Sequence, residues 1–176
     1  MASMNLVACL ALATVVAGSV LSNQRGPADA FRVMDVFDRA VSIYTSINDT
    51  DMKCATAFRK YLDLELKKCT YVWELKGHGG SAKRNATFDL EEGDAIDKLN
   101  YFINNDRTHP YSAHVIYRDY NACVVLQRSF LGHEQCMLWV KPAFVDDIPR
   151  HCRKNYKRKC SVSYPTYVSE LCKENQ

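Results

Sequence analysis

The chain has 176 residues, including eight cysteines, and a net charge of +3 from 23 Lys and Arg against 20 Asp and Glu. This length suits one domain, and so mild a positive balance gives no reason to expect a nucleic-acid partner. After the amino-terminal apolar run, no segment is apolar enough to span a bilayer, so we expect no membrane partner.

The amino terminus begins with an apolar run. Residues 6–16 (LVACLALATVV) carry no charge and are followed by Ala17, Gly18 and Ser19. The run is shorter than the roughly 20 residues that a transmembrane helix needs. The pattern predicts a signal peptide over residues 1–19, with residue 22 as a later cleavage position, and one mature domain over residues 20–176. We therefore expect a secreted, extracellular protein.

The cysteine content agrees with export. Cys9 leaves with the signal peptide, and seven cysteines remain: Cys54, Cys69, Cys123, Cys136, Cys152, Cys160 and Cys172. Seven in a secreted chain imply three disulfides and one cysteine left over. No CxxC pair or HxxxH spacing occurs, so we expect no metal site and no cofactor. The sequons at Asn48 and Asn85 predict glycosylation.

The first element of the mature chain is predicted to be a helix. Between Ala28 and Ile43, apolar residues recur at spacings of three and four, with Asp29 near the start. This periodicity is typical of one amphipathic helix.

The middle of the chain is predicted to be β-structure. Its segments show period-two alternation or β-branched and aromatic content, and turn residues separate them near residues 77–81, 92–94, 104–106 and 131–133. Several short strands at such spacing indicate an antiparallel barrel or sandwich. The segments are Thr70–Leu75, Lys98–Ile103, Ala113–Arg118, Ala122–Gln127 and Gln135–Lys141.

A basic segment near the carboxyl end, Arg150 to Cys160, is predicted to be a short helix. Cys152, Tyr156 and Cys160 recur at i, i+4 and i+8, so they share one face that packs on the domain. The opposite face is basic, and we interpret it as a solvated surface; the alternative is binding to heparan, a membrane or another acidic partner. The outward residues are Arg150, Arg153, Lys154, Lys157 and Arg158.

Five short motifs carry a family resemblance: Asp29-Ala30-Phe31, Asn48-Asp49, Tyr120-Asn121-Ala122-Cys123, Cys136-Met137-Leu138-Trp139-Val140, and Ile148-Pro149 followed by Cys152. With them the chain resembles the tick salivary lipocalins of the histamine-binding family over nearly all of its mature length. The resemblance implies a mainly β fold: an eight-stranded antiparallel lipocalin barrel with an N-terminal helix and a C-terminal helix. Such proteins are exported in saliva and bind host mediators.

The resemblance also implies the disulfide pairing. It pairs Cys54 with Cys172, Cys123 with Cys152, and Cys136 with Cys160. Cys69 is then left over, as a buried free thiol or, alternatively, as a bridge between two copies. We expect a monomer.

The family's leading ligands are biogenic amines such as histamine and serotonin, and a buried ammonium requires a carboxylate partner. Histamine binders carry an acid immediately before Leu-Trp and another before Val-Ile; this chain has Met137 and His114 there, and keeps Asp49. These departures favour a longer apolar or anionic ligand, such as a leukotriene or thromboxane-like lipid. The predicted ligand-binding set is Tyr44, Asp49, Trp73, Tyr101, His114, Met137 and Trp139.

Two other classes of function are alternatives. A lipocalin of this kind can act on a host protein, such as a complement component, through its outer surface, and the basic segment motivates that alternative. An enzyme is not expected, because the histidines and the Asp146-Asp147 pair match no nucleophile, metal or acid–base motif. His151 lies beside Cys152, but a cysteine in a disulfide is no nucleophile.

Overall fold

A computed structural model describes residues 26–77, 82–130 and 132–173. The predicted signal peptide lies outside these residues. Within them, no helix has the length and apolar character needed to cross a membrane. The elements are α1 (Ala30–Val36), β1 (Arg39–Thr45), η1 (Thr50–Met52), β2 (Thr56–Asp63), β3 (Lys68–Leu75), β4 (Arg84–Glu92), β5 (Lys98–Ile103), β6 (Asp106–Asp119), β7 (Cys123–Phe130), β8 (His133–Val140), η2 (Pro142–Phe144), α2 (Arg150–Lys159), β9 (Tyr164–Pro165) and α3 (Ser169–Lys173).

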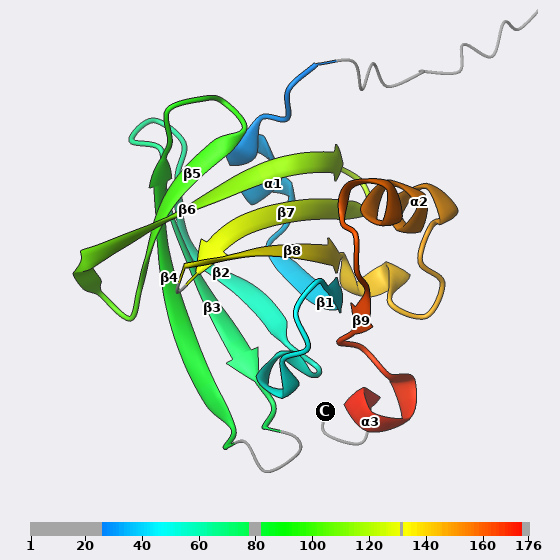
Figure 1. The fold of residues 1–176 in the computed structure, drawn as a ribbon. Coiled ribbons are helices and arrows are strands. Elements are labelled where there is room, and N and C mark those ends of the chain that lie inside the picture. Colours follow the sequence, from blue (N-terminus) through cyan, green and yellow to red (C-terminus); the bar gives the residue numbers. More distant parts are fainter. Residues whose placement is uncertain (1–25, 78–81, 131, 174–176) are drawn as a thin grey trace, which may run out of the picture.

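Eight antiparallel strands close into a barrel. Consecutive strands pair from β2 to β8, β8 pairs with β1, and β1 returns to β2, so the barrel has no free edge (Figure 1). The short β9 pairs with β1 at Tyr44 and Thr45. The predicted eight-stranded antiparallel barrel with flanking helices is confirmed.

The alternation within each strand separates the barrel interior from its outer face. In β3, Cys69, Tyr71, Trp73 and Leu75 are buried while the residues between them are half-buried. Strand β8 is buried at six consecutive positions, Gln135–Val140, because α2 packs on its outer face.

The predicted helix from Ala28 to Ile43 is wrong in its second half. The helix ends at Val36, and Arg39–Thr45 is strand β1. This strand pairs on both sides and is covered on both faces, so it is buried almost throughout and shows no period-two alternation. The spacing from Phe37 to Val41 and Tyr44 matched a helix by coincidence. Asp29 does cap α1, since its carboxylate accepts a hydrogen bond from the Arg32 amide at 2.9 Å.

Strands β2 and β4 were not predicted. A register shift between Arg59 and Tyr61 interrupts the alternation of β2. Strand β4 reads RNATFDLEE, and Phe88 is its one buried residue, so its apolar signal is weak. The turn at residues 104–106 was predicted: Asn104 and Asn105 both have positive φ, 52° and 63°, as a tight hairpin requires.

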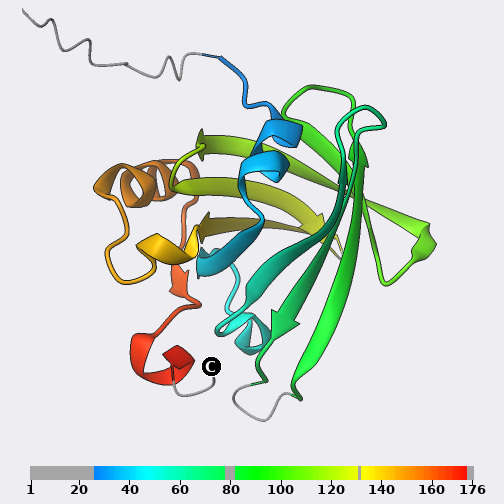
Figure 2. The ribbon, with the colours of Figure 1, turned by 180° about the vertical axis from the view of Figure 1, so that it is seen from behind.

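Helix α2 lies against the outer faces of β6, β7 and β8, and α1 lies across one end of the barrel (Figure 2). The buried residues of α2 and its C-cap, Cys152, Tyr156 and Cys160, join barrel residues in a second apolar core outside the barrel. The predicted helix with its cysteine face packed inward is therefore confirmed. The barrel residues of this core include Val41, Ile43, Val125 and Leu138.

Three disulfides fix the helical segments to the barrel. Cys54 joins Cys172, Cys123 joins Cys152, and Cys136 joins Cys160, with Cα–Cα distances of 5.3, 6.1 and 6.0 Å. All three pairs match the pairing implied by the family resemblance. Cys69 is a buried free cysteine, and burial raises the pKa of its thiol to about 12. Such a thiol is not reactive at neutral pH.

Removal of the longest bridge should destabilise the fold substantially. The Cys54–Cys172 bridge spans 118 residues, and in the chain-entropy model such a loop contributes about 4–5 kcal/mol. We expect Cys54→Ala/Cys172→Ala to lower the free energy of unfolding by about that amount in urea titrations. Cys69→Ala is the control that keeps all three bridges. A loss below about 1 kcal/mol in the double variant would contradict this role.

Candidate ligand-binding cavity

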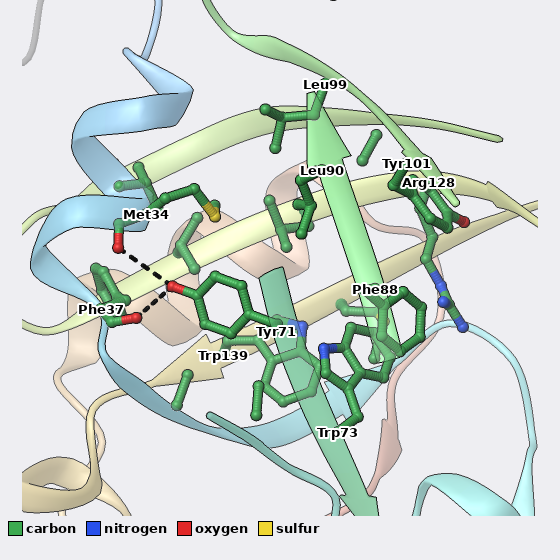
Figure 3. A pocket seen from close by; sticks show the side chains of 17 residues that line it. Met34, Phe37, Tyr71, Trp73, Phe88, Leu90, Leu99, Tyr101, Arg128 and Trp139 are labelled. Carbon is green, nitrogen blue, oxygen red and sulfur yellow. Dashed lines mark hydrogen bonds between the residues drawn. The ribbon is translucent and has the colours of Figure 1, made fainter. Parts of the chain in front are cut away.

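A cavity lies inside the barrel beneath α1 (Figure 3). About 70 Å³ of it is open to the centres of water molecules, which is several times what one water needs. Its walls come from α1 and from the inward-facing residues of the barrel strands. Among the described residues that line it, none is Asp or Glu, and the one charged side chain is Arg128.

Aromatic rings fill much of the space. Trp73 contacts Phe88 and Trp139, with ring centroids 4.1 and 4.7 Å apart. Tyr101 continues the series, 5.9 Å from Phe88. Both tryptophans of the chain therefore line the cavity and give it flat apolar surfaces.

Arg128 is the distinctive residue of the cavity. It is only 8% exposed, and its guanidinium carbon lies 4.9 Å from the Trp73 ring centroid and 5.0 Å from that of Phe130. Burial lowers the pKa of Arg128, while Tyr101 and the more distant charge of Asp49 oppose that shift. An arginine side chain stays protonated in proteins even so. No described carboxylate forms an ion pair with it.

A neutral hydrogen-bond chain holds Arg128 in place. Its Nε donates to Oε1 of Gln135 at 2.7 Å, and the Gln135 amide donates to the Thr45 hydroxyl at 2.8 Å. Gln135 lies opposite Arg128 in the β7–β8 ladder, which explains their contact. This chain orients the guanidinium without neutralising its charge.

The tyrosine beside Arg128 does not supply the missing negative charge. The Tyr101 hydroxyl donates to the Ser129 carbonyl at 2.8 Å. Burial raises the pKa of Tyr101 to about 12, although Arg128 opposes the shift. The phenol is therefore neutral at physiological pH.

The indole of Trp139 is a hydrogen-bond donor in the cavity wall. Its Nε1 is buried and has no hydrogen-bond partner among the described residues. A buried donor without a partner costs free energy, and a ligand acceptor would remove that cost. Among the residues that the structure describes, the lining thus offers an unpaired indole donor and a positive charge, and no anionic acceptor.

Helix α1 closes the cavity. Val33, Met34 and Phe37 line it from this side, and the buried Tyr71 hydroxyl donates to the carbonyls of Met34 (3.3 Å) and Phe37. Burial raises the pKa of Tyr71 above its ordinary value. Nη1 of Arg59 also donates to the Met34 carbonyl, at 2.6 Å. These bonds tie the end of the helix to the barrel interior.

Four of the seven predicted ligand residues meet in this cavity: Trp73, Tyr101, Met137 and Trp139. The other three do not line it. Tyr44 packs outside the barrel on Tyr156, with ring centroids 5.6 Å apart. Asp49 caps the turn η1 by accepting from the Asp51 amide at 2.9 Å, and His114 bonds Asp97 at 3.0 Å in an outer surface hollow.

Arg128 was missed because the predicted strand Ala122–Gln127 ended at the residue before it. Strand β7 continues to Phe130. The alternation of Val124 and Leu126 places Arg128 on the same inward face. A charged residue at an inward position was the signal that could have identified it.

One group of possible metal ligands occurs among the described residues: Cys123, His151 and Cys152. Both cysteines are joined to each other in a disulfide, so neither offers a thiolate. His151 bonds Asp119 at 2.6 Å on the surface. This group provides no metal site in the oxidised protein.

The closed barrel, its internal apolar cavity and the helix that covers one end define a lipocalin. The family model described as tick histamine binding protein matches residues 27–174. The chain therefore belongs to the tick histamine-binding protein family. A sequence comparison with curated proteins finds no match.

Solved structures agree on the fold. AM182, solved as a serotonin complex, has a TM-score of 0.63 at 16% identity and covers 83% of this chain and 94% of its own. Japanin from Rhipicephalus appendiculatus, solved with cholesterol, has a TM-score of 0.59 at 14% identity and covers 84% and 100%. Lobster apocrustacyanin A1 has a TM-score of 0.58 at 10% identity and covers 79% and 81%.

Removal of the Tyr71 hydroxyl should loosen α1. Tyr71→Phe leaves the buried Phe37 carbonyl without its Tyr71 donor, so we expect the free energy of unfolding to fall by about 1–3 kcal/mol. Amide hydrogen exchange should accelerate in α1 more than in β7. Tyr164→Phe, at a more exposed tyrosine, is the control. Unchanged protection of α1 in Tyr71→Phe would show that the hydroxyl does not hold the helix.

Proposed function

We propose that this protein is a secreted lipocalin that sequesters a small host mediator, mostly apolar and ending in a carboxylate, as eicosanoids are. The observation that carries the proposal is Arg128, a buried cation in a cavity whose described lining has no acid. In a tick protein, such sequestration would serve evasion of host immune and haemostatic responses. The protein would act as a carrier and not as an enzyme.

Burial removes the charge of Arg128 from water. A charge buried without a counter-charge costs several kcal/mol. A ligand carboxylate that reaches Arg128 would form charge-assisted hydrogen bonds, which are shorter and stronger than neutral ones. The rings of Trp73 and Phe88 would cover the apolar part of the ligand, and Trp139 Nε1 would suit a second oxygen. Nanomolar binding needs about 12 kcal/mol in total.

Biogenic amines such as histamine or serotonin are the second candidate, favoured by the family and by the serotonin complex of AM182. The lining of this cavity does not suit a cationic amine. An ammonium needs a carboxylate, and Met137, at a position where histamine binders carry an acid, lines the cavity as an apolar residue. His114, at the other such position, lies on the outer surface, and Arg128 would repel a cation.

The cavity must also widen to hold a ligand of this size. Pockets for drug-sized ligands measure roughly 300–1,000 Å³, so the present cavity is a narrow form that widens on binding. Met34 on α1 is a flexible side chain suited to such movement. The cholesterol complex of Japanin supports large apolar ligands in a related barrel.

Secretion is part of the proposal. The three disulfides require an oxidising compartment, and the apolar run at residues 6–16 is the predicted export signal. Asn48 and Asn85, the predicted glycosylation sites, are both exposed. The buried Cys69 favours a monomer, because a buried thiol is not available for a bridge between copies.

Calorimetric titration with arachidonic acid tests the ligand class. We expect wild type to bind the acid at least tenfold more tightly than arachidonyl alcohol, histamine or serotonin. Arg128→Gln should weaken binding of the acid about 10- to 100-fold, since charged hydrogen bonds contribute about 1.5–3 kcal/mol, and should leave the alcohol unaffected. Lys60→Gln, at an exposed lysine, is the charge-matched control.

Thermal unfolding separates a functional arginine from a structural one. Removing a buried unpaired charge should not lower the stability of the ligand-free protein, so Arg128→Gln should unfold at or above the wild-type temperature. Equal affinity of wild type and Arg128→Gln for the acid would refute the proposal, as would tight histamine binding that the variant retains.

A further inference from the structure

Helix α2 carries a stripe of exposed cations. Six of its ten residues are Lys or Arg, and each is exposed. None of them forms an ion pair with a described acidic side chain. The basic stripe, as we call it, consists of Arg150, Arg153, Lys154, Lys157, Arg158 and Lys159.

The geometry of α2 turns the stripe toward solvent and keeps it there. Cys152 and Tyr156 are fully buried against the barrel, and the disulfides of Cys152 and Cys160 fix the helix near both ends. Residues 150, 153, 154, 157 and 158 follow helical spacings of three and four, so they share the opposite face. At 1.5 Å per residue they form a row about 12 Å long.

The charge of the chain is concentrated in this row. The whole chain has 23 Lys and Arg against 20 Asp and Glu, so the residues outside the stripe carry 17 against 20. A protein that is slightly acidic elsewhere thus presents one strongly positive helix. A polyanion would therefore be drawn to this helix and not to the surface in general.

We propose that the basic stripe is a docking surface for a sulfated glycosaminoglycan. Such a polymer carries closely spaced sulfates along a linear chain, which matches a linear row of cations on a rigid helix. A membrane fits less well, because interfacial helices need a large apolar face toward the lipid. The outward face of α2 has none, since its apolar residues are buried in the core outside the barrel.

The stripe is separate from the ligand cavity. α2 packs on the outer side of β6, β7 and β8, while the cavity lies inside the barrel. Glycosaminoglycan docking would therefore hold the protein on a tissue surface while the cavity remains able to take up its ligand. The proposal does not depend on which ligand the cavity binds.

Heparin affinity chromatography with a sodium chloride gradient tests the proposal. Exposed charges are screened within about 8 Å at physiological ionic strength, so the salt concentration at elution measures the strength of the charge contacts with heparin. We expect wild type to elute well above 0.15 M salt and Arg153→Glu/Lys157→Glu to elute below it. Lys60→Glu/Lys83→Glu is the matched control: both lysines are exposed outside α2, and the change in net charge is the same. This control should elute close to wild type.

Three further measurements make the outcome decisive. Thermal unfolding should be unchanged in both double variants, since surface charges away from partners usually matter by little. Desulfated heparin should not retain wild type, and vesicles of phosphatidylserine and phosphatidylcholine should bind it more weakly than heparin does. Elution of wild type below 0.15 M salt, equal shifts in the two double variants, or stronger binding to the vesicles would each overturn the proposal.

Discussion

The guanidinium of Arg128 is buried at a cavity whose described lining has no carboxylate, and this placement limits what the cavity can bind. Arg128 is held by the neutral side chain of Gln135 and faced by aromatic rings. No described carboxylate forms an ion pair with it, and the charge of Asp49 acts on it from outside the cavity lining. In the proposed function, an anionic group of the ligand offsets the free-energy cost of that burial. Arg128 would then be the residue that selects the ligand.

The barrel separates this interior chemistry from its exterior. Inward residues of β7 and β8 line the cavity, while outward residues such as Val125 and Leu138 pack under α2. On the side of α2 the cavity wall is therefore backed by a second apolar core. The end of the barrel is covered by the short helix α1, which hydrogen bonds from Tyr71 hold in place.

Period-two alternation predicted an antiparallel barrel or sandwich, and the helical spacing of Cys152, Tyr156 and Cys160 predicted the basic helix. The closed eight-stranded barrel and the disulfide pairing were implied by the family resemblance. It did not predict β1 as a strand, since a strand buried on both faces shows no alternation. It identified three of the six aromatic residues among the described lining, Trp73, Tyr101 and Trp139, and missed Arg128. Asp49 and His114 were chosen by family position, and only the three-dimensional register places them outside the cavity lining.

A crystal structure of the protein with bound arachidonic acid would show directly where the ligand carboxylate lies. We expect it inside the barrel, within hydrogen-bond distance of the Arg128 guanidinium, with the hydrocarbon chain against Trp73 and Phe88. A carboxylate left in solvent at the barrel mouth, or a bound chain that does not contact Arg128, would contradict it.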